Sequence, residues 1–595
     1  MATSAARGTA APNQYRVIGT SPIRHDGIDK VTGVARYGAD INLPGMLHGK
    51  TLRSPHAHAR ILSIDTSKAE ALPGVQAVAT SKDFPIIEEN SLNPGTSGAI
   101  RVMAENNLAD KKVLYKGHAV VAVAATSPHI AEEAVSLIEV DYEVLPTVLG
   151  WREAMKEGAI LLHDNLTEKF SASRDATEDT GINSNIASHL QLKMGDVEQG
   201  FKESDTIVER EYNTQTVHQG YIEPFAFTAY WAPNGRLTIW TSTQGIFDVR
   251  TAAAEILGIA ESTIKVVPME VGGAFGGKGP AGEPVAAVLS KKSGHPVRMV
   301  MSRKEVFEGT GPSSGTFITV KLGAKKDGTI TAAQSSMIYE AGAYPGSPMV
   351  AGVTSGFSAY KIDNLILDGY DVVCNKPKAA AYRAPGHPQA AFAVESALDE
   401  LAETLGMDPM DLRLKNVARE GDRPITGVPH AHVGLKEVME AIKAHPHYSA
   451  PLGGPNRARG VATGYRLNVG GRGSSATLNV TSDGSVTLST GSMDLSGTRV
   501  ALAMQVAEVL GIAVEDVNAQ VGDTDSVGWT GRTGGSRTAF DTGRAAIAAA
   551  RLVIEQMSAR AALLWEVQSE DVEFIDGIFT CSRNTRDKLG FKELA

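Results

Sequence analysis

A glycine-rich stretch, Val271-Gly-Gly-Ala-Phe-Gly-Gly-Lys278, is the most informative chemical pattern in this sequence. It follows an expected strand at 264–267, and exposed backbone N–H groups on such a loop bind anions. The spacing partly fits the phosphate-binding loop of nucleotide hydrolases, in which Ser or Thr follows Gly-Lys and holds magnesium. Gly279 occupies that position, so ATP hydrolysis is disfavoured. Taken alone, the motif is equally consistent with a tight turn that binds nothing.

Three other short segments place polar residues just before an expected helix. In Tyr382-Arg-Ala-Pro-Gly-His-Pro-Gln389, Arg383 suits an oxyanion or carbonyl ligand, although a lone arginine more often forms a surface salt bridge. In Thr533-Gly-Gly-Ser-Arg537, the free N–H groups and positive dipole end of the following helix favour phosphate. Gln244 ends the strand segment starting at Trp240, where its amide could donate a fixed hydrogen bond into a pocket or simply begin a helix.

Hydrophobic periodicity and helix caps predict the elements that position these segments. An apolar strand at 118–123 leads to Ser127-Pro128, a typical helix start, and the alternating segment 138–143 indicates a half-buried strand. The helix opened by 382–389 should end at Gly406, and Asp408-Pro409 should cap a second helix that runs to Asn416.

The remaining chain divides at two segments that we expect to be linkers, the polar stretch 165–195 and the Pro/Gly-rich stretch 445–460. Beyond the second linker we expect three strands and two helices: strands near 460–467, 476–481 and 485–489, and helices near 499–510 and 536–565.

Composition excludes several classes of protein. The 595 residues carry a formal charge of −10, which argues against a general nucleic-acid binder. Two cysteines are too few for a disulfide scaffold or for a cysteine-ligated iron–sulfur cluster held by this chain alone. No secretory signal and no apolar run long enough to span a membrane is evident, so a cytoplasmic location is the expectation.

The motifs together resemble the molybdopterin-binding large subunit of the xanthine oxidase family of molybdenum hydroxylases, over about residues 20–595. The glycine loop resembles the family's Gly-Gly-Phe-Gly-Gly-Lys motif, and 382–389 resembles its Arg-Gly-Pro-Gly-x-Pro-Gln motif with Ala384 for the usual glycine. Asp29–Gly33, Leu52–Ile61 and the block 117–146 resemble the family's N-terminal hammerhead domain.

The resemblance implies an α+β fold in which a hammerhead α/β domain precedes two large mixed α/β molybdopterin-binding domains, the last incomplete. The implied division is a flexible tail at 1–20, the hammerhead domain at 21–150, the first molybdopterin-binding domain at 151–450 with the linker 165–195, and the second, truncated, at 456–595.

The resemblance also implies a molybdenum–molybdopterin cofactor, in its simple or its cytosine dinucleotide form, with no protein side chain on the metal. Gln244 should hydrogen-bond a molybdenum oxo ligand, and Arg383 should face the substrate. The other implied cofactor contacts are Gly273, Ala274, Phe275, Gly276, Arg413, Gly535 and Ser536. The implied reaction inserts oxygen from water into an aldehyde or N-heterocycle.

Two departures from the family pattern affect this expectation. In Gly491-Ser-Met-Asp-Leu-Ser-Gly-Thr498, Gly497 takes the place of a glutamine that touches the cofactor in many relatives. The family's general base, a glutamate in a Gly-x-Gly-Glu motif, has no match in this sequence. The sequence is therefore expected to be C-terminally truncated, to be completed by a separate subunit, or to be a degenerate relative without catalysis.

The resemblance implies partners as well. Electrons should pass to a [2Fe-2S] iron–sulfur subunit and onward to an FAD subunit, because this chain cannot hold those groups, and the assembly should dimerise. The identity of the substrate and the final electron acceptor do not follow from the sequence.

Overall fold

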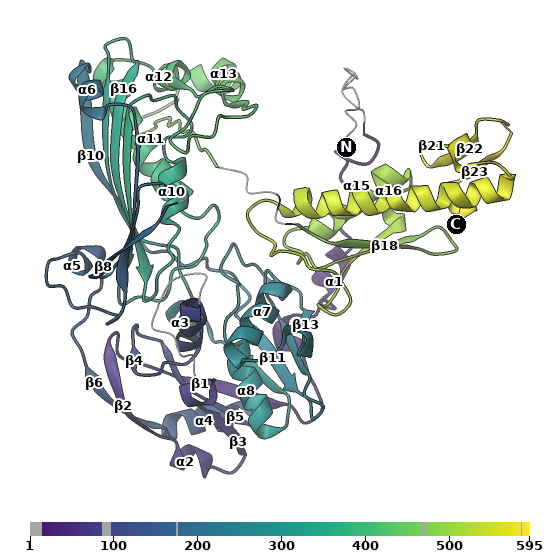
Figure 1. The fold of residues 1–595 in the computed structure, drawn as a ribbon, viewed down its shortest axis with the longest axis horizontal. Coiled ribbons are helices and arrows are strands. Elements are labelled where there is room, and N and C mark those ends of the chain that lie inside the picture. The colour runs from purple at the N-terminus through teal and green to yellow at the C-terminus, as the bar shows by residue number, and fades with distance from the viewer. Residues whose placement is uncertain (1–14, 86–96, 174–175, 467–470, 472, 585) are drawn as a thin grey trace.

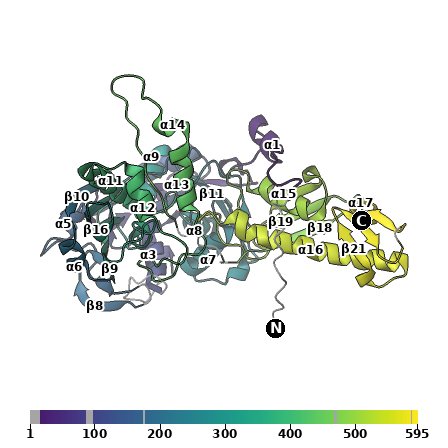
Figure 2. The same ribbon diagram turned by 90° about the horizontal axis from the view of Figure 1, so that it is seen from above.

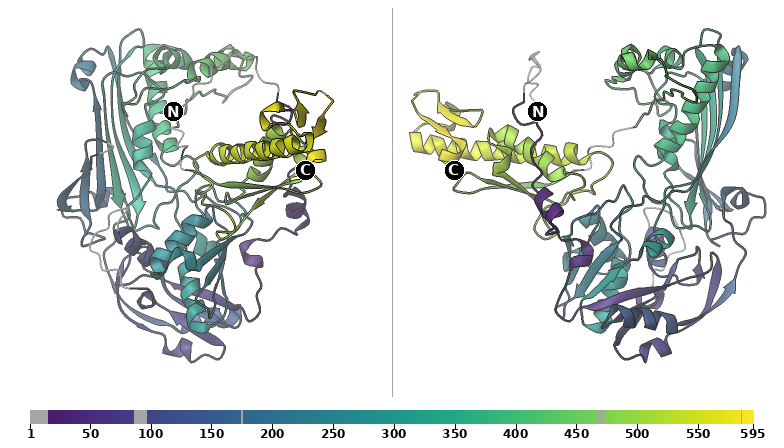
Figure 3. Two further views of the ribbon diagram at one scale, coloured as in Figure 1. Left: turned by 45° about the vertical axis from the view of Figure 1, so that its right-hand side comes forward. Right: turned by 180° about the vertical axis from the view of Figure 1, so that it is seen from behind.

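The computed structural model describes residues 15–85, 97–173, 176–466, 471, 473–584 and 586–595. It is a mixed α/β structure of three parts (Figure 1). A lower part contains the N-terminal strands and the glycine loop, an upper part contains a sheet of long strands in mixed orientation, and a C-terminal part extends to one side (Figure 3). Seen from above, the C-terminal part forms one end of an elongated molecule (Figure 2).

The lower part is built on a seven-stranded sheet whose strands come from two distant regions of the chain. Its order is β13 (Ile264–Pro268), β12 (Leu237–Thr241), β11 (Ala226–Trp231), β14 (Val297–Val300), β1 (Leu47–Arg53), β5 (Ala119–Ala125) and β3 (Val75–Ala79). β1 pairs with β14, so the expected hammerhead region shares one sheet with the strands that carry the glycine loop. Every residue of β5 is buried, which explains its uninterrupted apolar sequence.

Helices cover the lower sheet, and a small second sheet lies beside it. The helices are α3 (Ser97–Asn107), α4 (Pro128–Leu137), α7 (Ile246–Leu257), α8 (Glu283–Ser293) and the short α2 (Ser67–Glu70) and α9 (Arg303–Gly309). The small sheet contains β4 (Lys112–Val113), β2 (Ala59–Asp65) and β6 (Glu139–Val144). The predicted helix start is confirmed, since the Ser127 hydroxyl accepts a hydrogen bond from the Ile130 N–H at 3.2 Å.

The upper part is a second seven-stranded sheet packed against helices. Its order is β10 (Thr206–Thr214), β15 (Thr316–Ala324), β16 (Ile330–Gly342), β17 (Leu365–Val373), β9 (Ile186–Met194), β7 (Thr167–Ser171) and β8 (Glu178–Asn183). Its helices are α5 (Trp151–Ala154), α6 (Val197–Lys202), α10 (Met349–Ser355), α11 (His387–Leu405), α12 (Pro409–Asn416), α13 (Leu435–Ala444) and α14 (Pro446–Ser449). The predicted caps are confirmed, because Gly406 ends α11 and Asp408 caps α12.

The expected linker at 165–195 is wrong, because this segment supplies β7, β8 and β9 to the upper sheet. All six residues of β8 are exposed. An edge strand of this kind needs no apolar face, so its polar sequence resembles that of a loop.

The C-terminal part confirms the two predicted helices and two of the three predicted strands. A sheet of β18 (Ala476–Val480), β19 (Val486–Thr490) and β20 (Val517–Val521) packs against α15 (Thr498–Leu510) and the long α16 (Thr538–Trp565). A small sheet of β21 (Val572–Ile575), β22 (Ile578–Cys581) and β23 (Lys588–Gly590) precedes α17 (Phe591–Leu594). The strand expected near 460–467 is wrong over its described residues, 460–466, which form no regular element.

The N-terminal segment runs from the lower part to the C-terminal part and includes α1 (Gly27–Thr32). Residues 1–14 of the expected flexible tail lie outside the described residues. The described end of that tail is anchored, because the Glu508 carboxylate accepts hydrogen bonds from the N–H groups of residues 16–18. In the described part of the chain, no helix has the length and apolar character needed to cross a membrane.

Candidate cofactor and substrate site

Gln244 is the centre of the predicted site and joins three segments that are far apart in the sequence. It lies between β12 and α7, and only 5% of its surface is exposed. Its Oε1 accepts hydrogen bonds from the N–H groups of Gly276 at 3.0 Å and Lys278 at 3.3 Å. Its Nε2 donates to the carbonyl of Thr533 at 2.8 Å, which leaves one N–H of the amide for another acceptor.

The glycine loop needs glycine where the backbone turns and where it approaches a neighbouring loop. Gly273 and Gly276 have φ values of +93° and +110°, which side chains rarely tolerate. A Cβ atom on Gly276 would lie 2.6 Å from the carbonyl oxygen of Ala381. The loop is therefore packed against the segment that precedes Arg383. Between these glycines, Ala274 is buried and Phe275 is half exposed.

Lys278 has a structural role in the loop. Its side chain is fully buried, and its Nζ lies 2.5 Å from Glu223 and 5.1 Å from the centre of the Tyr221 ring. The same Glu223 carboxylate accepts a hydrogen bond from the Gly272 N–H at 2.7 Å. Burial lowers the pKa of Lys278, and Glu223 opposes that shift. The ammonium group thus fixes the start of the glycine loop, unlike the phosphate-binding lysine of a nucleotide hydrolase.

Arg383 lies next to the glycine loop. Its N–H donates to the carbonyl of Phe275 at 2.8 Å, and its φ is +29°. Its side chain is exposed and makes no ion pair with any residue in the described part of the chain. Ala384 and Gly386 also have positive φ values, and a Cβ on Gly386 would lie 2.3 Å from the Pro348 carbonyl.

The segment before α16 closes the site on the other side of Gln244. The Thr533 N–H donates to the Gln244 carbonyl at 2.8 Å, and the Thr533 hydroxyl donates to the Met493 carbonyl at 2.7 Å. Gly535 and Ser536 follow with φ values of +69° and +56°. The Ser536 hydroxyl accepts a hydrogen bond from Arg466 at 2.6 Å.

The loop that departs from the family pattern, 491–498, is held by a carboxylate. Asp494 accepts hydrogen bonds from the N–H groups of Gly497 at 2.9 Å and Thr498 at 2.7 Å. Arg499 binds Asp494 at 2.8 Å and Glu270 at 2.6 Å, so the loop is tied to the end of β13. Sequence reasoning missed this network, although Asp three residues before a glycine is a typical turn signal.

Arg413 is not brought together with the other predicted residues. It is completely buried between α11 and α12, where its Nε donates to Glu395 at 2.8 Å and its Nη1 lies 2.8 Å from Asp399. Glu395 also accepts hydrogen bonds from Thr463. These contacts give Arg413 a packing role in the upper part of the molecule.

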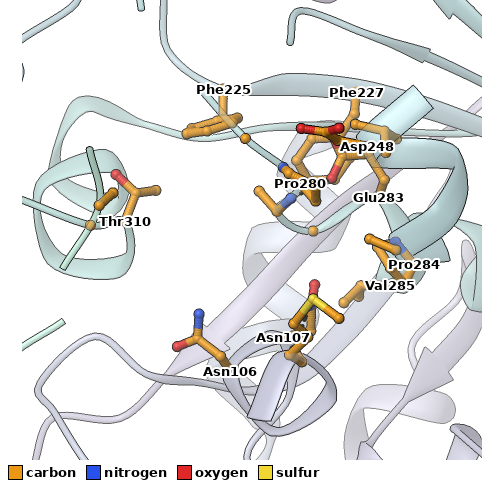
Figure 4. A pocket seen from close by; sticks show the side chains of 18 of the residues that line it. Asn106, Asn107, Phe225, Phe227, Asp248, Pro280, Glu283, Pro284, Val285 and Thr310 are labelled. Carbon is orange, nitrogen blue, oxygen red and sulfur yellow. Dashed lines mark hydrogen bonds between the residues drawn. The ribbon is translucent and has the colours of Figure 1, made fainter. Parts of the chain in front are cut away.

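A cavity of about 890 Å³ adjoins the glycine loop, with Gly276 and Gly277 in its wall. Asn106 and Thr310 lie across the cavity from Asp248 and Glu283 (Figure 4). Aromatic side chains also line it: Phe225, Phe227, Phe247 and Trp529. Of the predicted site residues only Gly276 lines this space. The glycine loop and the segment 533–536, which Gln244 joins, are together called the cofactor cradle, and the cavity adjoins this cradle at Gly276.

Three carboxylates that line this cavity are held by donors of the chain itself. Glu283 is buried, which raises its pKa, and it accepts hydrogen bonds from Thr241 at 2.9 Å and the Ala281 N–H at 2.6 Å. Glu305 accepts from the Ser302 N–H and Lys50, and Asp248 binds Arg532. The sequence does not show that these three carboxylates share a cavity, because they lie on segments that are separated in the chain.

The backbone around Gln244 suits an anionic ligand rich in hydrogen-bond acceptors. Within the described residues, no acceptor takes the N–H groups of Gly273, Ala274 and Phe275, or those of Gly535 and Ser536. Two runs of available N–H groups therefore lie on loops that Gln244 joins. Such runs bind oxyanions and polar heterocycles, and a pterin with a phosphate tail has both features.

Comparison with known proteins identifies the ligand class. Residues 179–417 and 435–595 match the family described as molybdopterin cofactor-binding domain, and residues 32–146 match the aldehyde oxidase and xanthine dehydrogenase a/b hammerhead domain. The chain is 34% identical over 532 residues to a probable xanthine dehydrogenase subunit of Bacillus subtilis, covering 87% of this chain and 68% of that protein. It is 31% identical over 600 residues to the xanthine dehydrogenase molybdenum-binding subunit of Escherichia coli O157:H7, covering 96% and 77%.

The chain belongs to the xanthine oxidase family of molybdenum hydroxylases, as a molybdopterin-binding large subunit. A solved structure agrees with this assignment: quinoline 2-oxidoreductase from Pseudomonas putida 86 superposes with a TM-score of 0.82 at 28% identity, covering 98% of this chain and 76% of that one. The expected fold class, oxidoreductase family and molybdopterin cofactor are confirmed. The individual site residues stay predictions.

Proposed function

We propose that this large subunit oxidises an aldehyde or an N-heterocycle, inserting an oxygen atom from water and releasing two electrons. One observation supports this most strongly: the two runs of available N–H groups joined by Gln244 lie beside a cavity large enough for a small aromatic molecule. The structural neighbour that acts on quinoline supports the N-heterocycle class. The bound molybdenum cofactor would supply the two-electron redox chemistry.

The residues of this chain would bind and orient. We propose that the free N–H of the Gln244 amide donates to an oxo ligand, with the Gly273–Gly276 backbone along the same edge. Gly535 and Ser536 would bind the pterin tail through their N–H groups at the start of α16. The exposed guanidinium of Arg383 would face the substrate and stabilise developing negative charge.

We propose a [2Fe-2S] subunit and an FAD subunit as the partners that carry the electrons away, in an assembly that dimerises in the cytoplasm. Two relatives are themselves named as subunits, which supports a multi-subunit complex. The two cysteines of this chain, Cys374 and Cys581, are both buried and cannot supply the four thiolates of a cluster.

A second candidate function, a cofactor-binding but non-catalytic relative, rests on the carboxylates of the cavity. Asp248, Glu283 and Glu305 are engaged by donors of the chain and are poorly placed to deprotonate water. Glu255 also lines the cavity, and burial raises its pKa, so an active enzyme that takes its base from the described cavity would use this carboxylate.

The test is to isolate the chain with its co-purifying subunits and to measure molybdenum, pterin and turnover of quinoline and benzaldehyde. Molybdenum and pterin together with turnover support the hydroxylase. Molybdenum and pterin without turnover of a broad substrate panel support the non-catalytic relative. A preparation without molybdenum, even after expression with excess molybdate, contradicts both proposals.

A further inference from the structure

Arg532 lies in the segment that precedes α16, and it lines the cavity. Its place relative to Gln244 is set by the backbone. It directly precedes Thr533, whose backbone N–H and C=O are both hydrogen-bonded to Gln244. Its own carbonyl accepts a hydrogen bond from Arg537 at 2.9 Å. A Cβ on Gly245 would lie 2.8 Å from the Arg532 Cβ, so the base of the side chain is closely packed. The position of Arg532 is thus fixed relative to the cofactor cradle.

Only one edge of the Arg532 guanidinium is used by the protein. Its Nε donates to Asp248 at 2.7 Å, and the side chain is 45% exposed. Neither of its Nη atoms donates a hydrogen bond to any residue that the structure describes. An arginine held in this way presents a planar pair of donors that matches the geometry of a carboxylate. Asp248 orients the group without occupying that pair.

Two aromatic side chains line the same cavity as Arg532. Trp529 is half exposed and lines the cavity three residues before Arg532, and Phe247 lines it immediately before Asp248. The two rings lie 6.5 Å apart between centroids. Arg250 lies over the Phe247 ring at 4.9 Å from its centroid, so Trp529 supplies the exposed aromatic face of this part of the cavity. A cavity lined by an arginine and an exposed aromatic ring favours a ligand that is both anionic and planar.

We infer that Arg532 is a specificity-determining residue that receives the carboxylate of an aromatic or heteroaromatic acid, which is the substrate class of this enzyme. The inference rests on the proposed hydroxylase function and deepens it. The carboxylate binds the Nη pair, the ring lies beside the half-exposed Trp529, and the other end of the ring is directed along the cavity toward Gly276. Asp248 is a positioning residue, since it acts through Arg532.

The test compares a carboxylate with a neutral compound of nearly the same shape. Pyridine-3-carboxylate and pyridine-3-carboxamide are titrated calorimetrically into the complete complex after anaerobic reduction with dithionite, so that the complex cannot accept electrons and no substrate is oxidised. The wild type should bind the carboxylate at least about tenfold more tightly than the carboxamide. Arg532→Gln should bring the ratio of the two dissociation constants close to one.

Arg236→Gln is the matched control. Arg236 is also an exposed arginine, 2.6 Å from Asp525, but it is not among the residues that line the cavity. This variant should keep the wild-type preference. Equal binding of the two compounds by the wild type, an unchanged preference in Arg532→Gln, or no binding of either compound would each overturn the inference. Molybdenum and pterin content of the same samples tests the proposed function separately, because neither arginine contacts the N–H groups assigned to the cofactor.

Discussion

Gly276→Ala tests whether the close approach of two loops creates the cofactor cradle. The substitution places a methyl group 2.6 Å from the oxygen and 2.8 Å from the carbon of the Ala381 carbonyl. It also forces alanine to a φ of +110°. Backbone strain costs about 1–2 kcal/mol and overpacking about 1–3 kcal/mol, so the native loop position should be disfavoured by roughly 2–5 kcal/mol.

The loops can relieve that strain by moving apart, which displaces the N–H of residue 276 from the Gln244 Oε1. If cofactor binding needs the native arrangement, a cost of roughly 2–5 kcal/mol corresponds to roughly 30-fold or greater weakening of binding. The measurement is molybdenum and pterin per chain in the purified complex, together with far-UV circular dichroism as a check on folding. We expect a large loss of both groups from a folded protein.

Gly279→Ala is the control in the same loop. A Cβ on Gly279 would meet nothing within 4 Å, and its φ is not positive. Its methyl group would project beside the cavity, so substrate binding can change while cofactor content should not. Equal molybdenum content in the two variants would refute the argument that loop approach at Gly276 forms the cradle.

Three further predictions concern the candidate site, the buried Arg413 and two buried histidines. Gln244→Ala and Arg383→Ala should lower turnover while leaving the circular dichroism spectrum intact, and wild-type turnover in both would remove them from the site. Arg413→Gln leaves the buried Glu395 without its charged partner, so the urea midpoint should fall by an amount equivalent to about 3–5 kcal/mol. Molybdenum per folded Arg413→Gln chain should stay at the wild-type value, and its selective loss would instead place this residue near the cofactor. Burial lowers the pKa of His118 and His163 to about 4. Each imidazole binds a proton near pH 6.5 in the unfolded chain but only near pH 4 in the folded protein. The stability that the two neutral histidines contribute is therefore present above pH 6.5 and is lost between pH 6.5 and 4. The urea midpoint should therefore fall from pH 7 to pH 5, and less so when both histidines are replaced by glutamine; an unchanged pH dependence in that double variant would contradict the assignment.

The helix boundaries could be predicted because their signals are local. Ser127, Gly406 and Asp408 cap helices through contacts within four residues of the chain, so the residue type alone marks the end. The polar segment 165–195 failed for the opposite reason. Its strands are stabilised by pairing with each other and with β17, and an exposed edge strand has no apolar pattern to detect.

The candidate site could be predicted only as a set of motifs. The glycine loop and the two segments before α11 and α16 were each visible as motifs. The glycine loop and the segment before α16 meet at Gln244 through hydrogen bonds between residues up to 289 positions apart, and the segment before α11 joins the glycine loop through Arg383. Arg532 gave no signal, since an arginine before Thr-Gly-Gly is ordinary until Asp248 is known to lie beside it. For Arg413 too, only the structure shows Glu395 and Asp399 around it, and its place near the cofactor stays a prediction.

Backbone conformation gives an independent argument that these loops are built for a ligand. Within the described residues, eight non-glycine residues have positive φ, and five of them lie in the loops around Gln244: Phe275, Arg383, Ala384, Ser496 and Ser536. Each such residue costs free energy that the surrounding structure must offset, and strain of this kind concentrates at functional sites. Ala384 makes the point most directly. It replaces the glycine expected from the family motif, yet it keeps a φ of +60°. The loop therefore has a left-handed turn at Ala384 without the glycine that adopts it free of strain, so the surrounding structure must hold the backbone beside Arg383 in this conformation.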